Sequence, residues 1–309
     1  MKKLPLLLLL LPLFCSSQDY VDLLRIGYGQ TFNNEFEGTP NSTYVKSFDA
    51  DLTVPVVINE KHAFITGAVY SRNNLQLFPE GDFTSLHSTI VKLGLASTYN
   101  TKWSSTLVFL PKVASDYVNS TSEDFYFGGL GLLKYQKNEH LKYRFGFYGS
   151  TEAFGFFTTP IIGWYYLSPN EKFEMDVSLP IAADVNYTFG ITTVGFDYIG
   201  IGRSFRITEN DADIYADVTE LNFASYLQFN ALEKSVLLRA KFGYSSSNYE
   251  LYPNGETIDL GLSAFSFGDD REPLNPEING GFYLKFEAIY RFDISEPTDT
   301  QPTIDETDY

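Results

Sequence analysis

The sequence predicts an all-β protein, a single antiparallel up-and-down barrel whose strands cross a membrane. Three observations predict this class. Apolar and polar residues alternate in segment after segment, the connections come in two lengths, and no run after Gln18 is long and apolar enough to form a spanning helix. Aromatic residues make up 17% of the 309 residues, which suits strands better than helices.

Residues 1–17 have the pattern of a secretory signal. Lys2 and Lys3 form the charged region, and residues 4–14 are apolar but too short to span a bilayer. Small residues follow, so cleavage is expected before Gln18 and the only cysteine, Cys15, leaves with the signal. The alternative, a lipoprotein acylated on Cys15, is disfavoured by the bulky Phe14. A mature chain in a membrane must then close as a barrel, because open strand edges cannot be satisfied in hydrocarbon.

The last regular stretch, residues 280–292, shows the alternation most clearly. Even positions from Phe282 read Phe, Leu, Phe, Ala, Tyr, Phe, and odd positions from Tyr283 read Tyr, Lys, Glu, Ile, Arg. Because successive side chains of a strand point to opposite faces, one face is apolar and ends in two aromatic rings, which is typical of a lipid-facing strand. Residues 44–56, 141–149, 172–179, 221–229 and 236–244 repeat the pattern, with charges almost confined to one face and Lys46 as the exception.

The alternation predicts fourteen strands. This number is even, so both ends of the barrel-forming chain lie on the same side. They are expected near 20–32, 43–58, 62–71, 88–99, 102–111, 124–135, 141–149, 156–167, 172–179, 183–188, 191–205, 217–229, 235–247 and 279–292. The tight turn at Pro180-Ile181 is the weakest of these assignments. If 172–188 is one strand, residues 259–267 supply the fourteenth; if the short hairpin is irregular, the count is twelve.

The connections between the predicted strands are alternately short and long, as in membrane barrels with short periplasmic turns and long outer loops. The long connections are expected at 33–43, 72–87, 112–123, 149–155, 206–216 and 248–278. The last of these is long enough to fold into the lumen. The barrel is assigned to residues 18–293, and residues 294–309 are expected to form an acidic, disordered tail.

The face opposite the apolar one is the candidate functional surface, because it would line the lumen. It carries charges of both signs. Its structural interpretation is a network of ion pairs that stiffens the wall, and its functional interpretation is a solute-selective pore with a transverse field. The candidate lumen-lining residues are Arg25, Asp49, Asp51, Lys92, Lys142, Arg144, Glu174, Asp176, Glu220, Arg239, Lys241, Lys285, Glu287 and Arg291.

Other function classes find little support in the sequence. The net charge of −17 disfavours a nucleic-acid partner, since phosphate binding needs a basic surface. No cofactor motif and no metal-ligand spacing is present; residues 209–213 lack the glycine and the distal glutamate of a calcium loop. Ser85 and His87 lie two residues apart near an outer rim, and they are the sole basis for a lipid-acting enzyme.

With the signal, the alternating segments and the terminal Tyr290-Arg291-Phe292 in view, the chain resembles bacterial outer-membrane β-barrel proteins. The ending is similar to the aromatic signal recognised by the barrel-assembly machinery, although 17 residues follow Phe292. Leu179-Pro180 and the run from Asp184 to Tyr187 also resemble an uncharacterised outer-membrane family of Gram-negative bacteria of the Bacteroidota type. The resemblance implies an outer-membrane location, contact with membrane lipid and lipopolysaccharide, and no catalytic residues.

The expected function is therefore a passive channel or transport pore. The alternative is a structural or partner-binding barrel with a blocked lumen. A lipid-acting enzyme at the rim is the least favoured hypothesis, and the sequence does not predict an enzyme.

Overall fold

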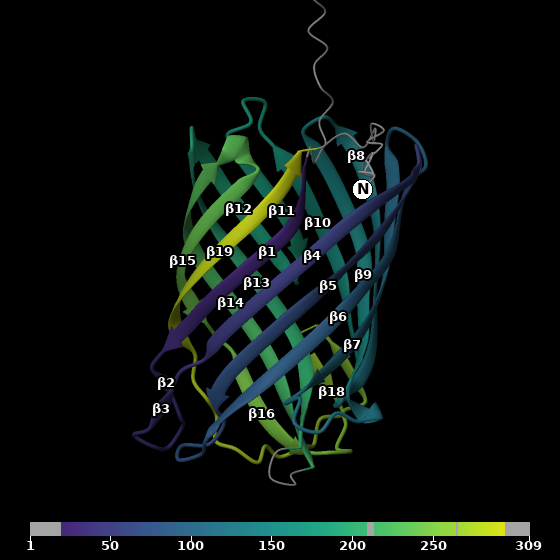
Figure 1. Ribbon diagram of the computed structural model, residues 1–309. Coiled ribbons are helices and arrows are strands. Elements are labelled where there is room, and N and C mark those ends of the chain that lie inside the picture. The colour runs from purple at the N-terminus through teal and green to yellow at the C-terminus, as the bar shows by residue number, and fades with distance from the viewer. Residues whose placement is uncertain (1–19, 209–212, 264, 294–309) are drawn as a thin grey trace, which may run out of the picture.

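A computed structural model describes residues 20–208, 213–263 and 265–293. The predicted signal, the predicted tail and most of the acidic run 209–213 lie outside these residues. The described chain forms a closed antiparallel barrel (Figure 1). The wall strands are β1 (Tyr20–Phe32), β4 (Lys46–Asn59), β5 (His62–Gln76), β6 (Phe83–Thr98), β7 (Trp103–Ser115), β8 (Phe125–Asn138), β9 (Leu141–Glu152), β10 (Gly155–Leu167), β11 (Phe173–Leu179), β12 (Ala182–Phe189), β13 (Thr192–Ile207), β14 (Ile214–Ala231), β15 (Val236–Ser245) and β19 (Gly281–Asp293).

Each wall strand pairs with the next one in this order, and β1 pairs with both β4 and β19, which closes the ring. The prediction of fourteen strands is confirmed, including the hairpin of β11 and β12 around Pro180-Ile181. Residues 259–267 do not supply a wall strand of their own. They form a small hairpin of β17 (Leu260–Leu262) and β18 (Phe265–Phe267). β17 pairs with residues 157–158 of β10, where the short strand β11 does not reach.

The remaining elements are short. They are β2 (Asn34–Glu35), β3 (Ser42–Thr43), β16 (Asn248–Pro253) and the 3-10 turns η1 (Ser122–Asp124) and η3 (Leu232–Lys234). Within the described ranges, no helix is long and apolar enough to cross a membrane.

The barrel has two different rims. β1 begins and β19 ends at the rim drawn uppermost in Figure 1, which also carries the short turns and is called the turn end below. The opposite rim, the loop end, carries the connections 33–45, 77–82, 116–124 and 246–280 among others.

Several predicted loops at the loop end are wrong in extent. β5 continues to Gln76 and β6 begins at Phe83, so most of the predicted loop 72–87 is strand, and the predicted loop 149–155 shrinks to residues 153–154. Apart from Phe83, the outer faces of these stretches carry mostly polar residues, so the apolar alternation weakens before the strands end. Ladder hydrogen bonds need no apolar side chains, and the wall extends beyond its apolar band.

The outer surface of the wall is apolar between two aromatic zones. Phe282, Leu284 and Phe286 of β19 are exposed on it, with Phe286 at 63%. Aromatic pairs lie on strands at the turn end, such as Trp103 with Tyr135, and at the loop end, such as Tyr44 with Phe83. An outward apolar band flanked by aromatic girdles is the surface of a membrane-spanning barrel.

Candidate functional site

The strand parity that exposes Phe286 turns the neighbouring charged residues inward. The fourteen candidate residues named from the sequence all have the lumen parity of their strands. β1 carries Arg25; β4 carries Asp49 and Asp51; β6 carries Lys92; β9 carries Lys142 and Arg144; β11 carries Glu174 and Asp176; β14 carries Glu220; β15 carries Arg239 and Lys241; and β19 carries Lys285, Glu287 and Arg291.

The structure joins one group of these residues into a network in the middle of the lumen. Lys285 Nζ lies 2.7 Å from Asp49 Oδ2 and 3.6 Å from Glu287 Oε1. Lys241 Nζ lies 3.0 Å from Glu287 Oε2 and 2.6 Å from Asp197 Oδ2. The Lys241 side chain is only 3% exposed, so these charges compensate one another away from bulk solvent.

Further pairs lie around this network. Lys92 binds Asp51 and donates to Thr53 Oγ1 at 2.7 Å. Arg144 Nη1 lies 2.8 Å from Asp176 Oδ1. Many of the inward charged residues are therefore paired with one another. This arrangement corresponds to the interpretation in which ion pairs stiffen the wall.

Sequence reasoning missed several members of the lumen network. Asp197 and Arg203 share the inward parity of β13. Because this parity is visible in the predicted strand 191–205, both residues could have been predicted from the sequence. Arg203 Nη2 lies 2.8 Å from Glu220 Oε1. Lys112 Nζ lies 2.6 Å from Glu152 Oε1, but both residues fell in stretches predicted as loops.

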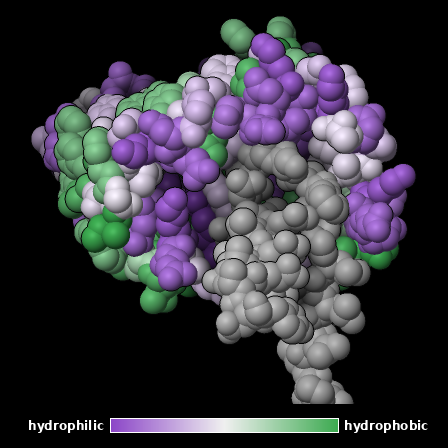
Figure 2. Space-filling view, turned by 90° about the horizontal axis from the view of Figure 1, so that it is seen from above, coloured by the Kyte–Doolittle hydropathy of each residue, from purple (hydrophilic) through white to green (hydrophobic). Residues whose placement is uncertain are grey.

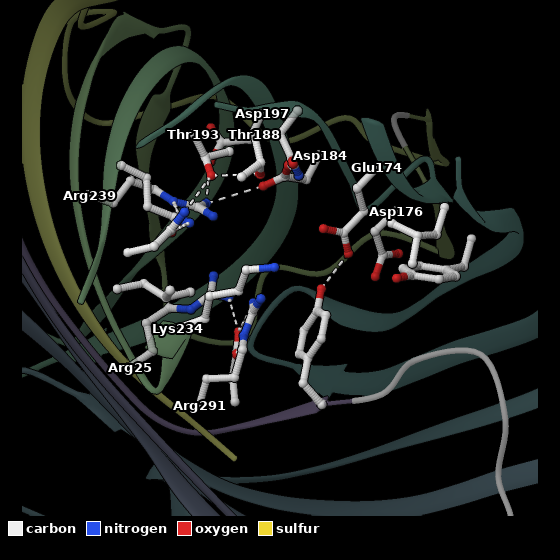
Figure 3. A pocket seen from close by; sticks show the side chains of 18 of the residues that line it. Arg25, Glu174, Asp176, Asp184, Thr188, Thr193, Asp197, Lys234, Arg239 and Arg291 are labelled. Carbon is white, nitrogen blue, oxygen red and sulfur yellow. Dashed lines mark hydrogen bonds and ion pairs between the residues drawn. The ribbon is translucent and has the colours of Figure 1, made fainter. Parts of the chain in front are cut away.

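A cavity of about 710 Å³ opens toward the turn end, where Figure 2 shows a hollow among hydrophilic side chains. We call it the turn-end cup. Figure 3 shows charged groups of both signs around it. Arg291 Nε donates to Asp22 Oδ1 at 2.6 Å and its guanidinium lies over the Tyr20 ring at 3.4 Å, while Tyr20 donates to Glu174 Oε1 at 2.5 Å.

The opposite side of the cup is a chain of hydrogen bonds. Arg239 Nε donates to Gln228 Oε1 at 2.9 Å, Gln228 Nε2 donates to Asn230 Oδ1 at 2.7 Å, and Asn230 Nδ2 donates to Thr193 Oγ1 at 3.0 Å. Arg239 also lies 3.2 Å from Asp184 Oδ2. The cup therefore presents neutral amides and hydroxyls between fixed ion pairs, a surface suited to a small polar solute.

The loop end of the lumen is filled by a packed apolar core, called the loop-end plug below. Wall strands on opposite sides contribute to it, and so do the connections at this rim. Its residues are Phe36, Val45, Leu75, Leu77, Leu86, Ala114, Tyr126, Phe205, Ile207, Ala216, Val218, Tyr249, Leu251 and Ile278. The opposite walls also touch directly, since Asp116 N donates to Arg206 O at 2.9 Å and joins the ends of β7 and β13.

Arg271 fastens the connection 246–280 over this end. Its guanidinium donates to Tyr215 Oη at 2.7 Å, to Asp217 Oδ2 at 3.1 Å and to Asp269 Oδ1 at 2.8 Å, and it stacks over the Tyr252 ring at 4.1 Å. The side chain is 3% exposed. Bonding to Arg271 lowers the pKa of the Asp269 carboxyl, which keeps its charge.

Ser85 and His87 have different hydrogen-bond partners. Both side chains face outward on β6, but Ser85 Oγ accepts from Arg72 Nη2 at 3.0 Å, and His87 Nδ1 lies 2.8 Å from Tyr70 Oη. Neither contact pairs the Ser85 hydroxyl with the His87 imidazole, which is the arrangement that nucleophilic catalysis requires. Within the described ranges, no group of three or more His, Cys, Asp or Glu residues could hold a metal ion.

The fold and the lumen define a fourteen-stranded barrel of the membrane-spanning type, with a polar cup at one end and a plug at the other. No protein-family profile and no curated protein matches the sequence. Solved structures that it resembles include a bacterial polysaccharide outer membrane secretin, with 9% identity, 88% of this chain and 99% of that chain covered, and a TM-score of 0.35.

Two other similar structures are a mutant of the TodX monoaromatic hydrocarbon channel and OprB of Pseudomonas putida. The TodX channel is 10% identical, covers 88% of this chain and 90% of its own chain, and has a TM-score of 0.34. OprB is 10% identical, covers 89% of this chain and 94% of its own chain, and has a TM-score of 0.32. At such values these proteins say nothing about the function of this chain, which has to be inferred from its own residues.

Proposed function

We propose that the protein is an integral outer-membrane β-barrel that acts as a gated solute pore. The turn end faces the periplasm and the loop end faces outward, as short turns and longer loops do in such barrels. The apolar outer band with its aromatic zones supports a membrane location. Outer-membrane lipid, lipopolysaccharide and the barrel-assembly machinery are the partners that this location implies.

One observation carries the proposal: the polar cup is open at the turn end, and the loop-end plug fills the lumen at the other. A polar lumen behind an apolar wall is what a water-filled path requires. In the conformation described here, the plug lies across that path.

The plug is partly built from a connection that lies outside the fourteen wall strands, although its β16 pairs with β14 and its β17 pairs with β10. Tyr249, Leu251 and Ile278 belong to the connection 246–280, and this connection is fastened by Arg271. Releasing this connection breaks the pairing of β16 with β14 and of β17 with β10 but leaves the pairings among the fourteen wall strands intact. This is less costly than opening the wall itself, because wall hydrogen bonds in lipid have no substitute.

Recordings in planar bilayers test the proposal. The native chain should show a small or absent conductance, and a chain with residues 248–278 replaced by a short Gly-Ser linker should show large, discrete openings. A chain lacking residues 294–309 is the control and should behave like the native protein. Equal large conductance in the native and linker chains would show that the plug does not close the lumen.

A second candidate is a permanently sealed barrel whose loops bind a partner. It is supported by the direct contact of β7 with β13 and by the plug residues Leu75 and Leu86, which belong to the wall itself. Silence of both the native and the linker chain, with both correctly folded, would favour this candidate over the pore.

A further inference from the structure

Two cations lie side by side on the outer, lipid-facing surface of the wall. Lys46 of β4 lies opposite Asn74, and Arg72 of β5 lies opposite Phe48, so Lys46 and Arg72 are diagonal neighbours on one face. Such neighbours have Cα atoms roughly 7–8 Å apart. Both share the parity of the exposed Val54 and Phe64, and Lys46 is the one charge that broke the alternation in the sequence.

Neither cation is neutralised by an ion pair among the described residues. The Lys46 ammonium lies over the Tyr44 ring at 5.0 Å, and the Arg72 guanidinium donates to Ser85 Oγ from Nη2 at 3.0 Å and from Nε at 3.3 Å. The lumen cations Lys285, Lys241 and Arg239, in contrast, each contact two carboxylates. Two uncompensated positive charges on the outer surface of a chain with a net charge of −17 are not part of a general basic excess.

The surroundings place these cations at the edge of the apolar band. Aromatic contacts surround them: Phe48 with Tyr70 at 6.1 Å, and His87 with Tyr117 at 4.9 Å. Toward the turn end the same β4 face continues with exposed Leu52, Val54 and Val56. Aromatic rings of this kind sit at the headgroup level of a bilayer, so Lys46 and Arg72 lie at the depth of lipid phosphates.

We propose that Lys46 and Arg72 bind a phosphate group of an anionic outer-leaflet lipid, such as a phosphorylated glucosamine lipid. The guanidinium fork supplies directed N–H donors and the ammonium supplies a mobile point charge, which together suit a phosphate. Asn74, which lies opposite Lys46, and Ser85, which lies opposite Asn74 on the next strand, add polar groups beside the two cations. The proposal rests on the proposed location, with the loop end facing outward.

Native mass spectrometry of the detergent-purified protein with diphosphorylated lipid A tests this site. The native chain should bind the lipid, and K46A/R72A should bind it more weakly by about tenfold for each cation removed, the loss expected for a charge-assisted hydrogen bond. The milder K46Q/R72Q should show the same loss and covers the case in which K46A/R72A fails to fold. K137A, which removes an exposed cation at the turn end, is the matched control and should bind like the native chain.

Equal binding of dephosphorylated lipid A or an equal loss in K137A would overturn the lipid site. So would displacement of the lipid by inorganic phosphate at the same phosphate concentration, which would indicate a simple anion site. A failure of the proposed location is recognised separately, because the native protein would then fractionate with soluble proteins. A native protein in the outer membrane with undiminished lipid binding in K46Q/R72Q would overturn the lipid site alone.

Discussion

Lys285 and Asp49 bond at 2.7 Å across an intervening strand, although 236 residues separate them in the sequence. β1 lies between their strands, and its residue Gly27 is paired with Asp49 on one side and with Glu287 on the other. A Cβ atom at Gly27 would lie 2.8 Å from Lys285 Cε. The missing side chain at Gly27 is therefore what lets Lys285 reach over β1.

Gly27→Val should displace the Lys285 side chain and weaken the barrel. Overpacking of a filled site costs about 1–3 kcal/mol, and here an ion pair is disturbed as well. The free energy of unfolding, measured with urea in lipid vesicles, should fall accordingly. Gly129→Val is the control, because its nearest contact would be an ordinary 3.7 Å on the outer surface. Equal destabilisation by both variants would contradict this role of Gly27.

Lys241→Met should be among the most damaging single substitutions in the lumen. It leaves Asp197 and Glu287 without a shared cation in a buried site, where breaking an ion pair costs about 3–5 kcal/mol. Lys92→Met is the comparison, since its partner Asp51 has a side chain 43% exposed and such pairs contribute about 1 kcal/mol or less. The same unfolding measurement distinguishes them, and the reverse order of losses would count against the network.

Arg271→Lys should loosen the connection at the loop end without disturbing the wall. Lysine keeps the charge but loses the fork that reaches Tyr215, Asp217 and Asp269 together. Amide hydrogen exchange in residues 265–278 should accelerate by about tenfold or more, and exchange in β4–β6 should stay unchanged. N254A, at the same rim, is the control. Unchanged exchange in 265–278 would show that Arg271 does not fasten this segment.

The Asp269 carboxyl should titrate below the usual aspartate range. Hydrogen bonds from Arg271 lower the pKa of Asp269 in the folded protein. The contact therefore stabilises the fold fully above the pKa that Asp269 has in the unfolded chain, and this contribution is lost as the pH falls through the pKa of the folded state. Carboxyl chemical shifts from NMR in micelles would report this pKa. In Arg271→Gln it should rise toward the ordinary value, and an unchanged low value would contradict the assignment to Arg271.

Local alternation was enough to predict the wall, because the lumen and lipid environments act on every second residue. Phe286 and Lys285 are sorted by the same rule as Leu52 and Asp51, so strand number and facing follow from sequence. The Pro180-Ile181 turn was also readable, since β11 and β12 alternate on either side of it.

The loop-end plug was not predictable in the same way. Leu75, Leu86 and Ile278 come from distant segments, and alternation does not show which inward apolar residues meet across a lumen. The partners of Arg271 are equally non-local, since Tyr215 and Asp217 lie on β14. The sequence indicated only that residues 248–278 were long enough to fold inward.

Spin-label accessibility along β19 tests the central claim, an apolar outer face in lipid around a charged lumen, most directly. Single cysteines would replace residues 282–290 one at a time, in a chain whose native Cys15 is changed to serine. Labels at 282, 284, 286, 288 and 290 should collide with oxygen, which concentrates in the bilayer, and labels at 283, 285, 287 and 289 should be shielded from it. High oxygen accessibility at 285 and 287 with shielding at 284 and 286, or no alternation at all, would contradict the account.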